Sequence, residues 1–94
     1  MSDENVIFVG KKNTKSYVLA IITQLNQNST KIVLKARGKS ISRAVDVAEM
    51  TRNRFVKDLN VKDIIISTEE VLNEDGTKLR VSAIEIVMEK EVKV

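Results

Sequence analysis

Hydrophobic residues along the chain follow two different periods, which predict the order of its strands and helices. Apolar residues spaced three and four positions apart predict amphipathic helices at about 15–27 and 40–57. Continuous or alternating apolar stretches are typical of β-strands, and four are present: 6–9, 31–36, 61–68 and 77–89. The predicted order of elements is therefore β-α-β-α-β-β.

Local signals mark the boundaries of the later elements. Ser40 follows the turn at Gly38 and is expected to cap the second helix. The segment Asn-Glu-Asp-Gly at 73–76 predicts a tight turn between the last two strands. In the last strand the alternation changes phase at 83–84, which predicts a β-bulge there. The second helix is expected to bury one stripe, with Val47 and Met50 beside it: Ile41, Ala44, Val45, Ala48, Arg52 and Phe55.

The connections between these elements predict the fold. Right-handed crossovers place both helices on one face of a mixed four-stranded sheet, which ends in a long C-terminal β-hairpin. The expected class is α/β, a two-layer α+β sandwich, and 94 residues fit a single domain, 1–94. The turns after the first two strands then fall at the same end of the sheet. Two basic turns, 10–12 and 37–39, are therefore expected to become neighbours.

The amino-acid composition limits the reactions that the protein could catalyse and the metals that it could bind. The chain has no histidine and no cysteine, so the usual general bases, nucleophile partners and soft metal ligands are missing. No two acids share an apolar setting that would separate their pKa values. The sequence therefore argues against an enzyme, and neither a cofactor nor a metal is expected. Without a secretory segment or an apolar run near 18 residues, the expected location is the cytoplasm, with no membrane partner.

Charge is divided along the chain. Residues 1–57 carry eleven basic and four acidic side chains, net +7, whereas residues 58–94 carry five basic and nine acidic ones, net −4. Eight basic residues and no acid lie between Asn5 and Val45: Lys11, Lys12, Lys15, Lys31, Lys35, Arg37, Lys39 and Arg43. This distribution favours a face that binds a polyanion. Scattered lysines on an ordinary solvated surface are the alternative.

The turn at Arg37-Gly38-Lys39-Ser40 ends like a nucleotide-binding phosphate loop. That loop needs a second glycine five residues before Gly38, and the position is Val33, inside a predicted strand. A phosphate loop that binds and hydrolyses a nucleotide is therefore excluded at this turn. A helix N-terminus still attracts phosphate, and arginine can hold a phosphate with two hydrogen bonds. Two cations beside a helix start oppose its dipole, which favours a functional reason for Arg37 and Lys39.

The spread of basic groups suits a polymer with many phosphates better than one small ligand. Only Tyr17 lies near the patch as an aromatic platform for unpaired bases, which favours a duplex read through its backbone with weak base specificity. Structured RNA fits the same patch and stays an alternative, as does a small interaction module or an enzyme. Lys78 and Arg80, beyond the acidic hairpin tip, could reach a groove or belong to an ordinary surface hairpin.

Three segments carry a resemblance to a known family: NVIFVGKKNTKSYVLAIITQLNQ, IVLKARGKSISRAVDVAEMTRNRF and STEEVLNEDGTKLRVSAIEIVM. Together they resemble the Alba family of archaeal chromatin proteins, over nearly the whole chain from Asn5 to Met88. The resemblance implies the β-α-β-α-β-β fold and a homodimer that binds and condenses double-stranded chromosomal DNA with little sequence preference. RNA binding is also known in the family.

The resemblance also assigns roles to individual positions. The pair Lys11 and Lys12 matches central DNA-contacting lysines, and Lys11 is the candidate for acetylation. The hairpin is expected to extend along the minor groove. The expected nucleic-acid-binding set is Lys11, Lys12, Lys15, Tyr17, Arg37, Lys39, Arg43, Lys78 and Arg80. The surface through which dimers meet side by side on DNA is expected at Asn53, Arg54 and Phe55.

The chain departs from the family pattern at two places. Proline is usual after the lysine pair, and Asn13-Thr14-Lys15 stands there instead. Proline is also common after the segment ending in Phe55, where this chain has Val56-Lys57-Asp58. A proline would have fixed a backbone angle in the first of these loops.

Overall fold

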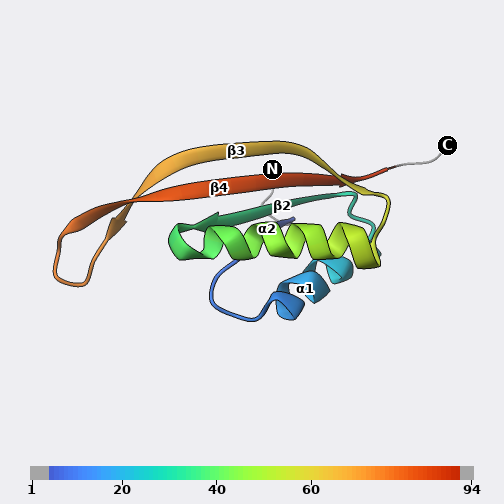
Figure 1. Ribbon diagram of the computed structural model, residues 1–94, viewed down its shortest axis with the longest axis horizontal. Helices are drawn as coiled ribbons and strands as arrows, with labels where there is room; N and C mark the ends of the chain where they lie inside the picture. Colours follow the sequence, from blue (N-terminus) through green and yellow to red (C-terminus); the bar gives the residue numbers. More distant parts are fainter. Residues whose placement is uncertain (1–4, 92–94) are drawn as a thin grey trace.

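The computed structural model describes residues 5–91, which form one four-stranded sheet with both helices on the same face (Figure 1). The strands are β1 (Val6–Phe8), β2 (Lys31–Arg37), β3 (Leu59–Leu72) and β4 (Lys78–Lys90). The helices are α1 (Thr14–Asn26) and α2 (Ile41–Met50), with short helical turns η1 (Gly38–Ser40) and η2 (Thr51–Phe55) before and after α2. The strand order is β1-β2-β4-β3, and only β1 and β2 are parallel. The predicted fold class is confirmed.

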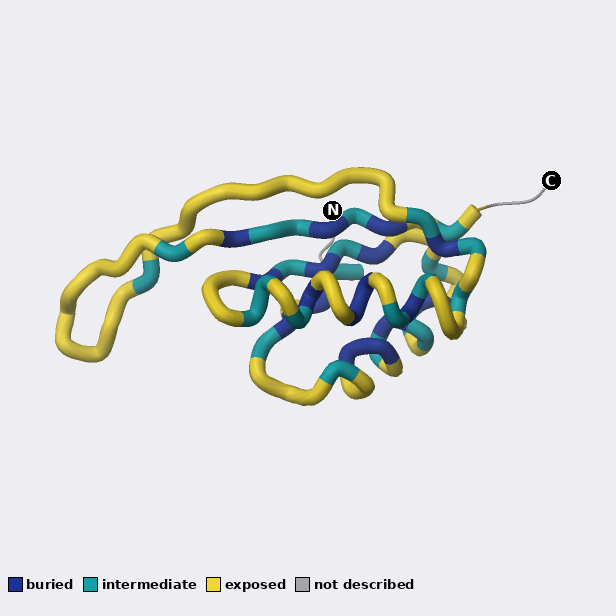
Figure 2. The backbone as a smooth tube through the Cα atoms, viewed as in Figure 1, coloured by how far each residue is buried: buried dark blue, intermediate teal, exposed yellow. Residues whose placement is uncertain are grey.

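The core lies between the sheet and the two helices, where Figure 2 shows the buried segments facing one another. Alternation along β2 places Ile32, Leu34 and Ala36 on the side of the helices, and all three are buried. Both α1 and α2 pack on β2 and cover these residues. The residues with the least exposure are Ile21, Ile32, Leu34, Val47, Thr51, Leu59 and Met88.

Helix α2 buries a different stripe from the one predicted. Ala44, Val47, Ala48 and then Thr51 are buried, whereas Val45 is 42% exposed. The helix packs on β2 and β4, and its buried residues form the face in contact with these two strands. The hydroxyl of Thr51 donates to the Val47 carbonyl at 2.8 Å, which satisfies a polar group inside the core.

Both ends of the second helix differ from the prediction. Ser40 occupies the N-cap position of α2, as predicted, but it has helical backbone angles (φ −86°, ψ −3°) and its side chain makes no capping hydrogen bond. Helical structure already begins at Gly38, whose φ of +58° is a left-handed conformation that glycine adopts without strain. At the other end the helix widens to a π-turn and stops at Phe55, where the Val56 N–H donates to the Thr51 carbonyl at 2.8 Å.

The predicted bulge at 83–84 is wrong, because β4 pairs without interruption through both residues. The register shift lies instead on β3, between Val61 and Asp63. The change of phase in the sequence has another cause. Along β4, Ala83 is the first residue that pairs with β2. Residues 78–82, which precede it, have no neighbour in β2, so their apolar side chains need not point toward the helices.

The rest of the hairpin projects past the body of the protein. We call residues 68–82 the arm, because they pair only with each other (Figure 1). Its tip is the predicted turn, in which the Gly76 N–H donates to the Asn73 carbonyl at 3.0 Å and Gly76 has a φ of +89°. The Thr77 hydroxyl and N–H both donate to the Asp75 carboxylate, at 2.6 and 3.0 Å, which lowers the pKa of Asp75.

Candidate nucleic-acid interface

The two basic turns lie at the same end of the sheet, as the topology predicted. Strands β1 and β2 run parallel, and the Val9 N–H donates to the Lys35 carbonyl at 2.8 Å where both strands end. Arg43, from the first turn of α2, donates through Nη1 to the Gly10 carbonyl at 2.8 Å. We call residues 10–15 and 37–39 together the basic end.

Tyr17 lies beneath the first of these turns. Its hydroxyl accepts hydrogen bonds from the N–H groups of Gly10, at 2.8 Å, and Lys12, at 3.0 Å. The side chain is only 8% exposed, so its ring offers no open face to a base. Its position makes Tyr17 a residue that holds the turn, with the side chains of Lys11 and Lys12 directed into solvent.

Asn13 holds the other end of this turn. Its carboxamide oxygen accepts from the N–H of Ser16 at 3.0 Å and from the Ser16 hydroxyl at 3.2 Å, and so caps α1. The residue that stands where the family usually has proline therefore contributes a helix cap. Lys15, in the first turn of α1, is exposed beside it.

Arg37 has a partner that sequence reasoning missed. Its Nη1 atom lies 3.2 Å from a carboxylate oxygen of Glu69, and the two side chains are 57% and 49% exposed. Strand β4 separates them. Arg37 pairs with Ala83 of β4, which pairs with Ser67 of β3, and Glu69 lies two residues further along β3, so the small side chain of Ala83 leaves the path across β4 open. The only sign of this ion pair in the sequence is the short side chain of Ala83, and its meaning becomes clear only once the pairing of the strands is known. Lys39 is exposed in η1.

The two arm residues predicted to bind nucleic acid are exposed, and the alternation of side chains along β4 shows on which face of the hairpin they lie. Lys78 and Arg80 are at even positions of β4, as are Ile84 and Ile86, which face the helices. The basic side chains of the arm therefore lie on the helix side of the hairpin. Arg80 stands opposite Glu70 in the register, yet within residues 5–91 the two form no ion pair.

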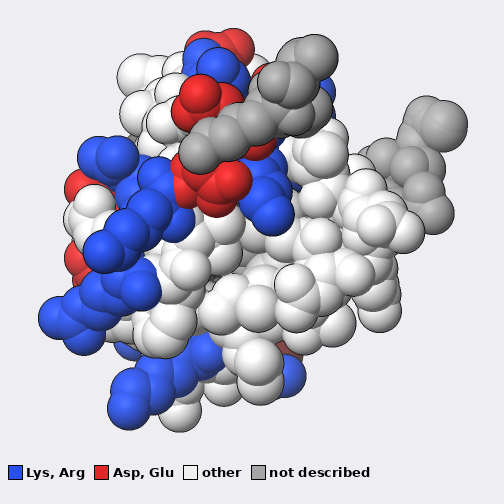
Figure 3. Space-filling view, turned by 90° about the vertical axis from the view of Figure 1, so that its right-hand side faces the viewer, with Lys and Arg blue, Asp and Glu red and all other residues white. Residues whose placement is uncertain are grey.

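The three residues expected at the contact between dimers lie far from the basic end. Asn53, Arg54 and Phe55 belong to η2, at the opposite end of α2, and all three are exposed, Phe55 by 57%. Figure 3 looks onto this end of the molecule and shows Lys and Arg side chains along one side of it, beside a mostly uncharged surface. The π-turn that carries these residues is a rare conformation that is frequent at functional sites.

Arg52 pairs with Glu49 one turn away, at 2.6 Å. The hydrogen bond from Arg52 lowers the pKa of Glu49, and the carboxylate in turn raises the pKa of Arg52. The chain between residues 5 and 91 contains no group of side chains arranged to hold a metal ion. None of its helices in that range combines the length and the apolar character needed to cross a membrane.

Fold and charge together define the class, a small α/β protein with basic turns gathered at one end of its sheet and an arm that extends past them. The chain belongs to the Alba family, whose family model matches residues 5–68.

Related proteins match nearly the whole chain. One is the DNA/RNA-binding protein Alba 1 of Archaeoglobus fulgidus, 56% identical over 88 residues, with 94% of this chain and 98% of the relative covered. The solved structure of Alba from Thermoplasma volcanium matches with a TM-score of 0.86 at 52% identity, covering 92% of this chain and all of the other. The structure of ALBA1 from Trypanosoma brucei gives a TM-score of 0.76 at 26% identity, covering 96% and 72%.

Proposed function

We propose that the protein is a non-enzymatic nucleic-acid-binding protein that compacts double-stranded DNA by contacting its phosphates, as a homodimer associated with the chromosome in the cytoplasm. The observation that carries this proposal is the basic end, where two turns distant in sequence meet and are fixed by Tyr17 and Arg43. The relatives named as DNA/RNA-binding proteins support it.

Phosphate binding follows from the side chains at the basic end. Lys11, Lys12, Lys15 and Lys39 are exposed point charges, and the planar guanidinium of Arg37 can hold a phosphate with two hydrogen bonds. Such contacts position a protein on a duplex but carry little base information, so sequence preference is weak. Acetylation of Lys11 would remove one of these charges and weaken binding.

The arm supplies the second part of the proposed interface. Lys78 and Arg80 lie on the helix side of the hairpin, and the arm projects from the same end of the sheet as the basic turns. A duplex bound at the basic end would therefore lie within reach of the arm, whose two basic side chains would follow the minor groove.

An apolar strip on β3 supports the homodimer. Ile64 and Ile66 point to the helix side, but α2 does not cover them, and they are 56% and 78% exposed. Neighbouring Ile65 is 43% exposed on the other face. A contiguous apolar patch on a long edge strand marks an interaction site, and a second copy of the chain would bury it. We place the side-by-side contact of such dimers at Asn53, Arg54 and Phe55.

The test reverses single charges at the basic end. Lys11→Glu and Arg37→Glu are each expected to abolish duplex binding in gel shifts at about 50 mM salt, because each replaces an attraction to phosphate by a repulsion. Circular dichroism checks that both variants fold. Lys31→Glu is the matched control, since Lys31 is exposed at the opposite end of the same strand as Arg37. Full affinity in both basic-end variants would overturn the proposed site.

RNA is the second candidate ligand, because the same charges fit the phosphates of a structured RNA and the relatives are named for both nucleic acids. A competition titration of duplex DNA against structured RNA, at about 50 and about 200 mM salt, distinguishes them. Displacement of the duplex by an equal concentration of RNA would favour the RNA-binding function.

A further inference from the structure

The face of the sheet opposite the helices carries a hollow that the proposed duplex site does not use. One row of residues crosses this face in register on the four strands, namely Phe8, Lys35, Glu85 and Ile65. The hollow has a volume of about 310 Å³ and is bordered by Phe8, Lys35 and Glu85 of this row, by Arg37 at the end of β2 and by Glu69 of β3. That volume lies in the range of small-ligand pockets.

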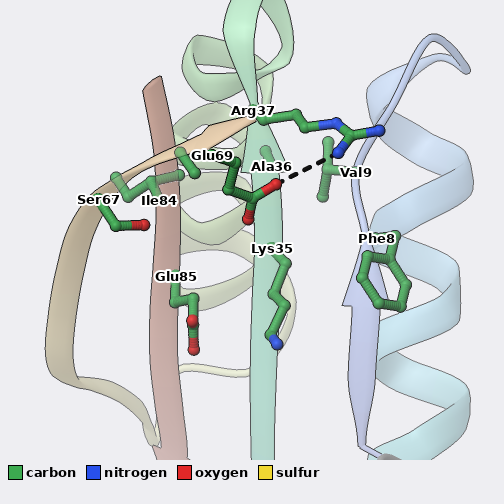
Figure 4. A pocket seen from close by; sticks show the side chains of 10 residues that line it. Phe8, Val9, Lys35, Ala36, Arg37, Ser67, Glu69, Ile84 and Glu85 are labelled. Atoms are coloured by element: carbon green, nitrogen blue, oxygen red, sulfur yellow. Dashed lines mark hydrogen bonds and ion pairs between the residues drawn. The ribbon is translucent and has the colours of Figure 1, made fainter. Parts of the chain in front are cut away.

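Phe8 is the unusual member of the row. The sequence predicted a buried strand at 6–9, and Ile7 and Val9 are indeed buried, but Phe8 is 72% exposed. The aromatic ring lies on the open side of the sheet, at the edge of the hollow (Figure 4). An exposed aromatic ring on a four-stranded sheet is the feature on which unpaired bases stack in sheet-based RNA-binding domains.

Charged groups surround the ring, and of these Arg37 and Glu69 form an ion pair at 3.2 Å. Lys35 and Glu85 are direct neighbours across two strands, yet no ion pair joins them in residues 5–91. Figure 4 shows their side chains pointing the same way along the sheet without meeting. It also shows Arg37 reaching over Val9 toward the strand that carries Phe8. The hollow therefore combines an aromatic face, two cations and two carboxylates.

We propose that this hollow binds an unpaired nucleotide of single-stranded RNA. The base stacks on Phe8, and Lys35 and Arg37 contact the phosphates on either side of it. The carboxylates of Glu85 and Glu69 repel phosphate but accept hydrogen bonds from base amino groups and from the ribose 2′-hydroxyl. The 2′-hydroxyl is absent from DNA, so the carboxylates select RNA. A base inside a duplex is already stacked on both sides and does not fit.

This site goes beyond the proposed duplex interface and is independent of it except for Arg37. Phe8 lies on the face of the sheet opposite the helices, whereas Lys78 and Arg80 lie on the helix side. Phe8 and Lys35 are therefore available for a test that leaves the remaining basic-end residues unchanged.

The first experiment uses Phe8→Trp as a reporter. The chain contains no tryptophan, so the emission of this variant comes from position 8 alone. Addition of a single-stranded RNA of about ten nucleotides without secondary structure is expected to quench the emission, because the base stacks on the indole. Quenching by a DNA strand of the same sequence is expected only at higher concentration, and duplex DNA is expected to leave the emission unchanged.

The second experiment uses Phe8→Ala, with affinities measured by fluorescence anisotropy of labelled strands. Affinity for the single-stranded RNA is expected to fall about 5- to 150-fold, the range for losing one base–aromatic stack. Duplex affinity is expected to stay as in the wild type. Leu19→Ala, which trims a 64% exposed apolar residue on α1, is the control and is expected to change neither affinity.

Unchanged RNA affinity in Phe8→Ala, or equal affinity for the RNA and the matching DNA strand, would overturn this proposal. The duplex function is tested separately, because its failure would appear as full duplex binding by the Lys11→Glu and Arg37→Glu variants. A protein that binds duplex DNA but no single-stranded RNA would overturn only the site at Phe8.

Discussion

Arg37 illustrates what individual residues do at the proposed interface, because it has two competing partners. In the free protein its guanidinium pairs with Glu69 on β3 at 3.2 Å. Both side chains are about half exposed, and a pair of this kind contributes little, on the order of 0.2–1 kcal/mol. A phosphate that is also held by neighbouring lysines would displace Glu69. The carboxylate therefore acts as a weak competitor for the phosphate.

Removing this competitor is expected to strengthen binding. Glu69→Gln should raise duplex affinity by up to about fivefold, the equivalent of a surface pair of about 1 kcal/mol. Glu70→Gln serves as the control, since it removes the same charge from the next residue of the arm, which has no ion pair with Arg37. Duplex affinity is measured by anisotropy titration at low salt. If it rises equally in both variants, the cause is the change in net charge, and Glu69 does not compete with phosphate for Arg37.

At the scale of elements, α1 acts on the basic end through one side chain. The Tyr17 hydroxyl holds two N–H groups of the turn between β1 and α1, which are otherwise without a partner in the described chain. The turn is short and bears both Lys11 and Lys12, so its backbone decides where these charges lie. A pre-formed turn loses less conformational entropy when it binds phosphate.

The variant Tyr17→Phe tests this coupling. It leaves both N–H groups without their acceptor, and the free energy of unfolding is expected to fall by about 1–3 kcal/mol in denaturant titrations. Duplex affinity should fall several-fold, while its salt dependence stays the same because no charge has changed. Thr23→Val removes a hydroxyl that bonds the Leu19 carbonyl on the exposed side of α1, and should leave binding intact. A steeper or shallower salt dependence in Tyr17→Phe would contradict this role.

At the scale of the whole molecule, shape and apolar surface favour assembly. The chain extends over 52 Å in its longest direction and only 27 and 20 Å in the others, because the two strands of the arm project past the body and pair only with each other. The uncovered strip at Ile64 and Ile66 lies in the body of the protein, beside α2. Two copies joined there would carry two basic ends and two arms on one particle.

Ile66→Glu is expected to keep the protein monomeric. A carboxylate at a buried dimer contact loses its hydration, so association becomes unfavourable. Light scattering after gel filtration should give a mass near 10.6 kDa for this variant and twice that for the wild type. Leu19→Glu, which places the same charge on the exposed side of α1, should remain dimeric. A dimeric Ile66→Glu protein would place the interface elsewhere.

The sequence by itself determined the order of elements, the hairpin turn and the convergence of the two basic turns. These features depend on local periodicity, on turn chemistry and on the handedness of strand connections, all of which can be inferred without knowing long-range contacts. The lysines and arginines of the basic end were singled out by the distribution of charge along the chain, and their role in binding stays a prediction.

Only the tertiary structure decided which faces are covered. It placed α2 over β2 and β4, which left Ile64 and Ile66 open and buried Val47 in place of Val45. It also turned Phe8 to the open side of the sheet and brought Glu69 to Arg37 across Ala83. An apolar or charged residue has the same local pattern whether or not another element packs on it, and pairing between distant strands supplies the missing information.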